Sequence, residues 1–279
     1  MKIEKIKKAD LPDQLQNIPS PPKEIFLLGK IPGSRPFITI VGSRKPTAYG
    51  REITELIARD LAQTGAVVVS GLALGIDSIA HKACLDAGGQ TVAVLPCGLD
   101  NIYPATHRNL ALEILEKDGA LISEYPAGTP ALKQHFIARN RLVSGLSQAT
   151  IIIEAAQKSG TLITAGFALE QNRDVYAVPG NITSPNSAGT NEMINQGASI
   201  ITSSQQLLDS LGFAKEKRSV SGETPIENLI LDLLEQGVRD GDELQAQVKI
   251  GTAEFNQTLT MMEITGKIKP LGGNQWTRN

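Results

Sequence analysis

The sequence predicts an α/β protein in which a parallel sheet is covered by helices on both faces and is followed by a small winged-helix domain. Between residues 37 and 213, short runs rich in valine and isoleucine alternate with amphipathic helical segments. These runs end in glycine or small polar residues, as strands do before a turn. The last 55 residues contain three helical segments and a hairpin. Together these observations favour a sheet domain followed by a smaller helical domain.

Residues 1–36 precede this pattern and contain six prolines. Proline interrupts helices and central strands, so we expect an irregular N-terminal arm that packs on the sheet domain. Its one short apolar piece is residues 25–28. The first residues are rich in lysine and have no apolar core segment, so we expect no signal peptide.

The sheet domain is expected to span residues 37–213. Its predicted strands are residues 37–41, 66–69, 91–95, 120–123, 150–153, 174–178 and 199–202. Helices are predicted between most of them, including residues 50–63, 77–86, 109–117 and 161–171. The crossovers should be right-handed. Ligands bind such sheets beyond the carboxyl ends of the strands, so the residues that follow each strand are the candidates for a site.

Residues 214–224 are polar and are predicted to be a linker. Residues 225–279 should then form helices near 226–235, 241–247 and 253–265, and a hairpin at 267–277 with a Gly-Gly-Asn turn. This order of elements fits a winged helix-turn-helix. Residues 214–279 carry 8 Lys and Arg against 10 Asp and Glu. That balance favours contact with a protein over tight binding of duplex DNA.

The composition, with 41% hydrophobic and 20% charged residues, is that of a globular protein. Because the net charge is −2, an anionic ligand must be bound by a local patch rather than by a global basic field. Two stretches without acidic residues, 30–51 and 125–153, are candidates for such a patch. No run of about 18 apolar residues exists, so no membrane span is predicted. Cys84 and Cys97 are expected to be buried thiols in a reducing cytoplasm.

The stretch of residues 133–141 is the most informative part of the chain. Read as a helix, it places Ala138 and Leu142 on an apolar face. The outward face carries Lys133, Phe136, Arg139 and Asn140. An aromatic ring among outward-facing cations is typical of a surface that stacks a nucleobase and neutralises phosphates. The alternative is that Phe136 belongs to the core and that the cations form a solvated face.

Three loops at predicted strand ends resemble anion sites. Gly42-Ser43-Arg44 follows the first strand, and arginine grips phosphate with a planar fork. Ser70-Gly71, with Gly75 further along the loop, and Ser159-Gly160-Thr161 each lead into a helix whose first N–H groups attract anions. The spacing of a dinucleotide-binding fingerprint is absent. The alternatives are a surface arginine and ordinary capping by Asp77, Ser159 or Thr161.

The residues with catalytic or metal-binding chemistry are scattered. The three histidines are widely spaced and share no ligand motif: His81, His107 and His135. Glu124 and Glu154 follow predicted strands, and we expect them to bind backbone N–H groups or arginines rather than to act as an acid/base pair. The sequence therefore predicts no catalytic residues, no metal and no cofactor.

Eight stretches, in this order, resemble the DprA/Smf family of DNA-processing proteins. They are residues 40–44, 70–81, 95–104, 123–126, 136–141, 154–155, 159–165 and 177–180. The resemblance implies an extended Rossmann-like fold, a homodimer, a cytoplasmic protein and no established catalytic activity. It also implies a pocket at the carboxyl edge of the sheet that binds single-stranded DNA, with Arg44, Lys133 and Phe136 at the family's arginine, lysine and phenylalanine positions. The implied function is to protect incoming single-stranded DNA and to help load the RecA recombinase during natural transformation.

The predicted DNA-binding residues combine the motifs and the resemblance. They are Gly42, Ser43, Arg44, Ser70, Gly71, Gly75, Lys133, Phe136, Arg139, Asn140, Ser159, Gly160 and Thr161. Two alternatives remain. One is a Rossmann-like enzyme that releases the base from nucleoside monophosphates, although residues 157–164 lack the double glycine and the glutamate of its usual motif. The other is a regulator that binds duplex DNA through the winged helix.

Overall fold

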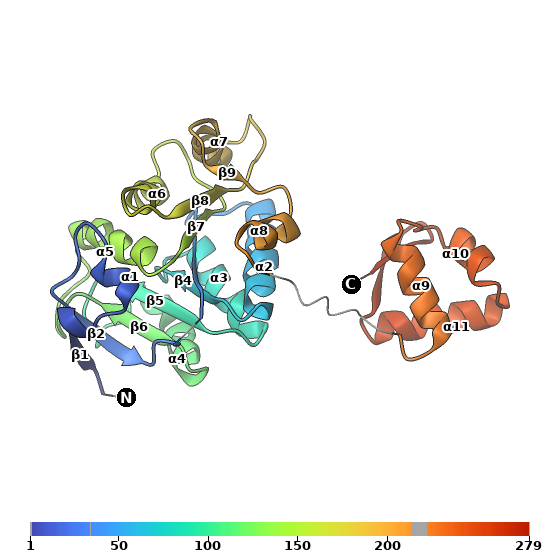
Figure 1. Cartoon of the computed structure of the whole chain (residues 1–279), viewed down its shortest axis with the longest axis horizontal. Coiled ribbons are helices and arrows are strands. Elements are labelled where there is room, and N and C mark those ends of the chain that lie inside the picture. The colour runs from blue at the N-terminus through green and yellow to red at the C-terminus, as the bar shows by residue number, and fades with distance from the viewer. Residues whose placement is uncertain (1, 34, 214–221, 279) are drawn as a thin grey trace. The chain divides into compact units, whose positions relative to one another are not determined.

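The computed structural model describes residues 2–33, 35–213 and 222–278 (Figure 1). It divides into two compact units, one on each side of residues 214–221. We call them the sheet unit and the winged-helix unit. Of the predicted linker 214–224, residues 214–221 lie outside the described residues. The remaining part contacts the first helix of the winged-helix unit, because Glu227 N–H donates to Thr224 Oγ1 over 3.2 Å.

The sheet unit follows the predicted alternation of strands and helices. Its strands are β1 (Glu4–Lys7), β2 (Glu24–Gly29), β3 (Phe37–Val41), β4 (Val67–Ser70), β5 (Thr91–Leu95), β6 (Ala120–Ser123), β7 (Ala149–Ile152), β8 (Asp174–Ala177) and β9 (Ser199–Ile200). Its α-helices are α1 (Asp13–Gln16), α2 (Ala48–Gln63), α3 (Ile76–Asp86), α4 (Arg108–Glu116), α5 (Lys133–Gly145), α6 (Gly160–Glu170), α7 (Ala188–Asn195) and α8 (Ser204–Ser210). Each predicted strand overlaps one of the strands from β3 to β9.

Within the described residues, the strands of this unit form one sheet in the order β1-β2-β6-β5-β4-β3-β7-β8-β9. The strands from β3 to β9 pair in parallel. This arrangement confirms the predicted α/β class. It also places the carboxyl ends of the parallel strands at one edge of the sheet.

The expectation of an irregular N-terminal arm is wrong for residues 4–7 and 24–29, which form strands. β1 pairs antiparallel with β2, and β2 pairs antiparallel with β6, so the arm extends the sheet at one end (Figure 1). The prolines lie outside these two strands, and Ile25 and Leu27 of β2 are buried in the core. The pairing joins segments about 95 residues apart, as in Phe26 with Ser123, so local patterning does not reveal it.

Apolar side chains cover both faces of the sheet, as parallel strands require. On one face, Ile38 and Ile40 of β3 pack in a cluster with residues of α2, α3 and α8. On the other face, Phe37 and Val41 of the same strand pack with α5 and α6. The alternation along β3 therefore places α5 on the opposite face from α2 and α3.

The winged-helix unit contains α9 (Pro225–Glu235), α10 (Gly241–Val248), α11 (Thr252–Ile264), β10 (Ile268–Gly272) and β11 (Gln275–Arg278). β10 and β11 pair antiparallel, and the predicted Gly-Gly-Asn turn joins them, with Asn274 at φ +60°. Its own cluster of buried side chains joins the three helices to β10. These elements confirm the predicted winged helix.

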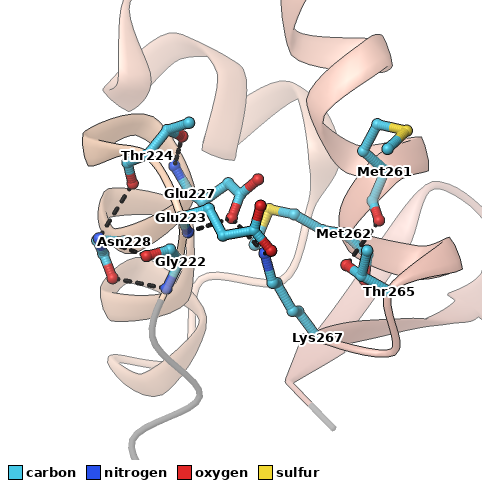
Figure 2. Close-up of polar contacts among 9 residues, drawn as sticks. All are labelled: Gly222, Glu223, Thr224, Glu227, Asn228, Met261, Met262, Thr265 and Lys267. Carbon is cyan, nitrogen blue, oxygen red and sulfur yellow. Dashed lines mark hydrogen bonds and ion pairs between the residues drawn. The ribbon is translucent and has the colours of Figure 1, made fainter.

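A partly buried charge cluster joins the start of α9 to the start of the hairpin, with Lys267 and Glu227 buried and Glu223 exposed. Figure 2 shows the Lys267 amine beside the carboxylates of Glu223 and Glu227, at 3.0 and 2.7 Å. Glu227 also accepts the Glu223 N–H at 2.7 Å. Glu223, which lies within the predicted linker 214–224, is therefore held to the winged-helix unit.

Candidate functional site

A cavity of about 710 Å³ lies at the carboxyl edge of the sheet, between the loops after β3 and β7 and the first turns of α5. The strand order changes direction here, because β3 has β4 on one side and β7 on the other. Open parallel sheets bind their ligands at such a point. Eleven of the thirteen predicted residues line the cavity: Gly42, Ser43, Arg44, Gly71, Lys133, Phe136, Arg139, Asn140, Ser159, Gly160 and Thr161.

A half-buried aromatic ring and two exposed cations meet at this cavity. The Cζ atom of Arg44 lies 5.5 Å from the centroid of the Phe136 ring, in a cation–π arrangement. Lys133 is the first residue of α5 and is exposed. Within the part of the chain that the structure describes, neither cation forms an ion pair. Both are therefore available to an anionic ligand beside an aromatic face.

Tyr103 is a second aromatic side chain in the cavity, and the sequence reasoning missed it. Its ring meets Phe136 edge to face, with centroids 5.4 Å apart and planes at 76°. The Tyr103 side chain is 47% exposed. It lies in the loop after β5, within one of the stretches that carried the family resemblance. The available signal was an aromatic residue in a strand-end loop, which by itself is weak.

The prediction that Arg139 lies on the outward face of its helix is wrong. Arg139 is 5% exposed, and its Nη1 donates to the carbonyl oxygens of Gly71, at 2.6 Å, and Val94. These carbonyls lie at the carboxyl ends of β4 and β5. Burial lowers the pKa of Arg139 to about 10, opposed by the negative charge of Asp77. Arg139 therefore forms the floor of the cavity rather than its exposed rim.

Asp77 occupies the N–H groups that the glycine-rich loop was expected to offer. Its Oδ2 accepts hydrogen bonds from Gly71 N at 3.1 Å and Ala73 N at 3.4 Å. The carboxyl group is buried, which raises its pKa, while Arg139 acts in the opposite direction. The capping alternative for Asp77 is wrong, because Gly75 is the N-cap residue of α3 and Asp77 bonds the loop before the helix. The Gly71 N–H is therefore already bonded within the protein.

Ser70 and Gly75 are the two predicted residues that do not line the cavity. Ser70 Oγ is buried and donates to the Ile40 carbonyl at 2.6 Å, which ties β4 to β3. Gly75 has φ +81°, and a Cβ atom there would lie 2.3 Å from the Ser43 carbonyl oxygen. Only glycine fits this close approach, so Gly75 sets the position of the Gly42-Ser43-Arg44 loop.

The Ser159-Gly160-Thr161 loop is also held by internal bonds. Ser159 Oγ accepts from Thr161 N at 3.1 Å and caps α6, as the capping alternative predicted. Thr161 Oγ1 donates to the Gly42 carbonyl at 3.1 Å, which ties this loop to the one that carries Arg44. Asn140 Nδ2 approaches the Gly160 carbonyl at 3.5 Å. The loop is a fixed wall of the cavity.

Both strand-end glutamates are bonded within the protein, as expected. Glu154 accepts the Thr47 hydroxyl at 2.5 Å and the Thr47 N–H at 3.0 Å, at the start of α2. Glu124 binds Nη2 of Arg141 through both carboxylate oxygens, at 2.6 and 2.7 Å. Neither glutamate is among the residues that line the cavity.

Other titratable groups serve the fold. Cys84 and Cys97 are free and buried, as predicted. Burial raises the pKa of the Cys84 thiol to about 12, which keeps it protonated.

Across the described residues, no group of three or more His, Cys, Asp or Glu side chains is placed to hold a metal ion. Likewise, none of the described helices has the length and apolar character needed to cross a membrane.

A known protein family model matches each of the two units. The family of DNA recombination-mediator protein A matches residues 2–212, and the DprA winged helix domain matches residues 214–274. Protein Smf of Escherichia coli strain K12 is 43% identical over 203 residues, covering 72% of this chain and 54% of that protein. The DNA processing protein DprA of Bacillus subtilis strain 168 is 40% identical over 210 residues, covering 74% and 70%. This chain spans about half the length of the two Smf proteins that it matches from Escherichia coli and Synechocystis.

Two solved structures of DNA processing proteins resemble about three quarters of this chain. DprA from Streptococcus pneumoniae superposes with a TM-score of 0.69 at 37% identity, covering 75% of this chain and 74% of that one. DNA processing protein A from Helicobacter pylori, described for its single-stranded DNA binding mode, has a TM-score of 0.68 at 32% identity. That match covers 76% of this chain and 96% of the other.

Proposed function

The chain belongs to the DNA recombination-mediator protein A family, and from this premise we propose that it binds single-stranded DNA in the cavity at the carboxyl edge of its sheet. The observation that carries the proposal is the pairing of Phe136 with two exposed cations, Arg44 and Lys133, at one cavity. Proteins that bind single strands combine positive charge along the backbone with aromatic rings that stack bases. The relative from Helicobacter pylori, described for its single-stranded DNA binding mode, supports single-stranded DNA as the ligand.

Each group has a separate role in this proposal. Arg44 and Lys133 neutralise phosphates, and Phe136 stacks a base, which typically contributes about 1–3 kcal/mol. Arg139, Asp77 and Gly75 fix the floor and the loop positions without touching the DNA. If about three phosphates are neutralised, log K should fall with log[salt] at a slope of about −2. Every nucleobase has a flat aromatic face that can stack on the Phe136 ring, so the binding should show little sequence preference.

The test is a gel shift that compares single-stranded with duplex DNA across a salt series. We expect the wild type to prefer the single strand, and the Arg44→Ala/Lys133→Ala double variant to lose most of that affinity. Lys5→Ala, which removes an exposed lysine of β1 that pairs with Glu24 of β2, is the matched control. Equal binding by the wild type and the double variant would remove the cavity from the binding site.

We further propose that the protein works as a homodimer that protects incoming single-stranded DNA and passes it to a RecA recombinase in natural transformation. The family description as a recombination mediator supports this role. The free, buried thiols are consistent with a reducing cytoplasm. Light scattering measures the dimer. RecA-driven strand exchange on DNA already coated with single-strand binding protein, with and without this protein, measures the loading.

We also propose that binding, not catalysis, is the activity of this cavity. Glu154, a strand-end carboxylate that an acid/base mechanism could use, does not line the cavity, and both of its carboxylate oxygens hold Thr47. An assay for release of adenine from AMP tests the competing reading as a hydrolase of nucleoside monophosphates. Turnover that disappears in Glu154→Gln would support that enzyme instead.

A further inference from the structure

An aromatic and an aliphatic side chain stand exposed on the same edge of the sheet as the cavity, but outside it. Tyr49, in the first turn of α2, is 44% exposed. Ile182, in the segment between β8 and α7, is 92% exposed, the highest value among the large apolar side chains exposed in the described residues. Neither residue lines the cavity. A single exposed apolar residue is ordinary, but this pair belongs to two segments that are bonded to each other.

Hydrogen bonds tie the Ile182 segment to the start of α2 at both ends. The Tyr49 hydroxyl donates to the Pro179 carbonyl at 3.1 Å, before Ile182. Asn186 Nδ2 donates to the Lys45 carbonyl at 3.1 Å, after Ile182. The segment that carries Ile182 therefore lies next to the loop that follows Arg44.

The conformation around Ile182 is also fixed from within. Asn181 Oδ1 accepts from the Thr183 N–H at 3.0 Å and from the Thr183 hydroxyl at 2.9 Å. Ser184 N donates to the Asn181 carbonyl at 2.9 Å, which closes a turn with Ile182 inside it. The turn holds the isoleucine side chain out into solvent, where hydrophobic burial would favour a partner.

Lys45 supplies a positive charge in the loop that is bonded to the Ile182 segment. Lys45 follows Arg44 directly and is exposed. Among the residues whose structure is described, no carboxylate pairs with it. Glu154, the nearby buried carboxylate, is held by Thr47 rather than by Lys45. Lys45 and Tyr49 are four residues apart, and the hydrogen bonds to Asn186 and Pro179 join both of their segments to the segment that carries Ile182.

We propose that Tyr49, Ile182 and Lys45 form a second subsite for single-stranded DNA, which takes one nucleotide beyond the cavity. The base packs on the Tyr49 ring and the Ile182 side chain, and Lys45 neutralises its phosphate. This subsite rests on the proposed function, because it extends the same strand from Arg44 toward β8. The hydrogen bond from Tyr49 to Pro179 fixes the ring before the DNA arrives, which lowers the entropy cost of binding. Stacking tolerates every base, so the subsite should add affinity without sequence preference.

The experiment measures how affinity grows with the length of the DNA. Fluorescence anisotropy is recorded with oligothymidylates of about four and about eight nucleotides, within the usual range of single-strand site sizes. We expect Tyr49→Ala and Ile182→Ser to bind the short strand as the wild type does. With the long strand, Tyr49→Ala should lose roughly 5- to 100-fold and Ile182→Ser a smaller factor.

Two control variants distinguish the loss of a DNA subsite from the effect of removing any exposed apolar side chain and from misfolding. Leu112→Ser removes a 49% exposed apolar residue from α4, and it should leave both affinities unchanged. Tyr49→Phe keeps the ring and removes the hydroxyl that binds Pro179, so it should retain most of the gain with length. Ile182→Ser changes an exposed tip, so it folds normally even if Tyr49→Ala does not.

The outcomes distinguish this inference from the function on which it rests. If the wild type gains affinity with length and both variants gain as much, the second subsite is wrong and the cavity assignment stands. If the wild type binds neither strand, the proposed function fails and the subsite fails with it. A loss restricted to the long strand supports the subsite.

Discussion

The guanidinium of Arg44 lies over the ring of Phe136, with Cζ 5.5 Å from the ring centroid. The two side chains come from segments about ninety residues apart, the loop after β3 and the helix α5. A phosphate that draws Arg44 away from the ring would uncover the face on which a base stacks. Phosphate binding and base stacking should therefore depend on each other.

This dependence predicts a measurable coupling between the two residues. Phe136→Ala should weaken binding of single-stranded DNA by about 1–3 kcal/mol. In a double-mutant cycle with Arg44→Ala, the two losses should differ from additivity by about 0.5–1 kcal/mol, the size of an exposed cation–π contact. Isothermal titration of the four proteins gives the coupling. Strict additivity would show that the residues act independently.

The salt dependence of binding separates the cations from the ring. Arg44→Ala and Lys133→Ala should each reduce the salt slope by about 0.7, because each removes one neutralised phosphate of a single strand. Phe136→Ala should lower the affinity and leave the slope nearly unchanged, since stacking releases no counterions. Lys5→Ala serves as the control with an unchanged slope. A Phe136→Ala slope as shallow as that of the Arg44 variant would contradict this division of roles.

Arg139 and Asp77 are predicted to stabilise the fold together. Removing Arg139 alone leaves the buried Asp77 carboxylate without its nearby cation and removes the Nη1 donor from the Gly71 and Val94 carbonyl groups. Arg139→Met should lower the free energy of unfolding by about 3–5 kcal/mol. Adding Asp77→Asn should restore part of that loss. Urea denaturation followed by circular dichroism measures both, and an Arg139→Met protein as stable as the wild type would show that the buried charge is not needed.

His81 is predicted to make the protein acid-sensitive. Thr91 donates its hydroxyl proton to the Val68 carbonyl, so the short contact between Thr91 and His81 requires a proton on His81 Nδ1. The opposite ring nitrogen, Nε2, is buried without a hydrogen-bond partner in the described structure. Burial, with smaller contributions from His107 and Arg139, lowers the pKa of His81 from 6.5 to about 3. The folded protein therefore resists a second proton on this ring.

The sign of the pH effect follows from that difference. Below pH 6.5 the unfolded chain takes up a proton at His81 that the folded chain refuses until about pH 3. The contribution of His81 is thus complete above pH 6.5 and is lost as the pH falls toward 3, by up to about 1.4 kcal/mol per pH unit. His81→Asn keeps a donor near Thr91 and cannot titrate. Its unfolding free energy between pH 6 and 4 should fall less steeply than that of the wild type, and parallel curves would contradict the assignment.

The winged-helix unit is predicted to be dispensable for binding single strands. No Lys or Arg occurs in α11, Thr252–Ile264, the third helix of the unit, which carries Glu254 and Glu263 instead. A chain that ends at residue 213 should bind single-stranded DNA within about threefold of the full chain, a difference below 1 kcal/mol. A much larger loss would place DNA contacts in this unit.

Much of the fold was predictable because it depends on local patterns. Alternating runs of valine and isoleucine located the strands from β3 to β9, and polar residues after them located the carboxyl edge. Phe136 and Lys133 were identified from one helix and one acid-free stretch, and they do line the cavity. These features were visible because each depends on residues close together in the chain.

The remaining features depend on contacts between distant segments. A helical projection assigned Arg139 to solvent, but the ends of β4 and β5 present two carbonyls to it and turn it into the floor of the cavity. Tyr103 became part of the site only because its loop reaches Phe136. The sequence by itself thus determined the class of the fold, the edge that carries the site and the chemical character of its cations and ring. Only the tertiary structure decided which polar groups are already bonded to one another and which remain open, because that depends on partners the local pattern cannot specify.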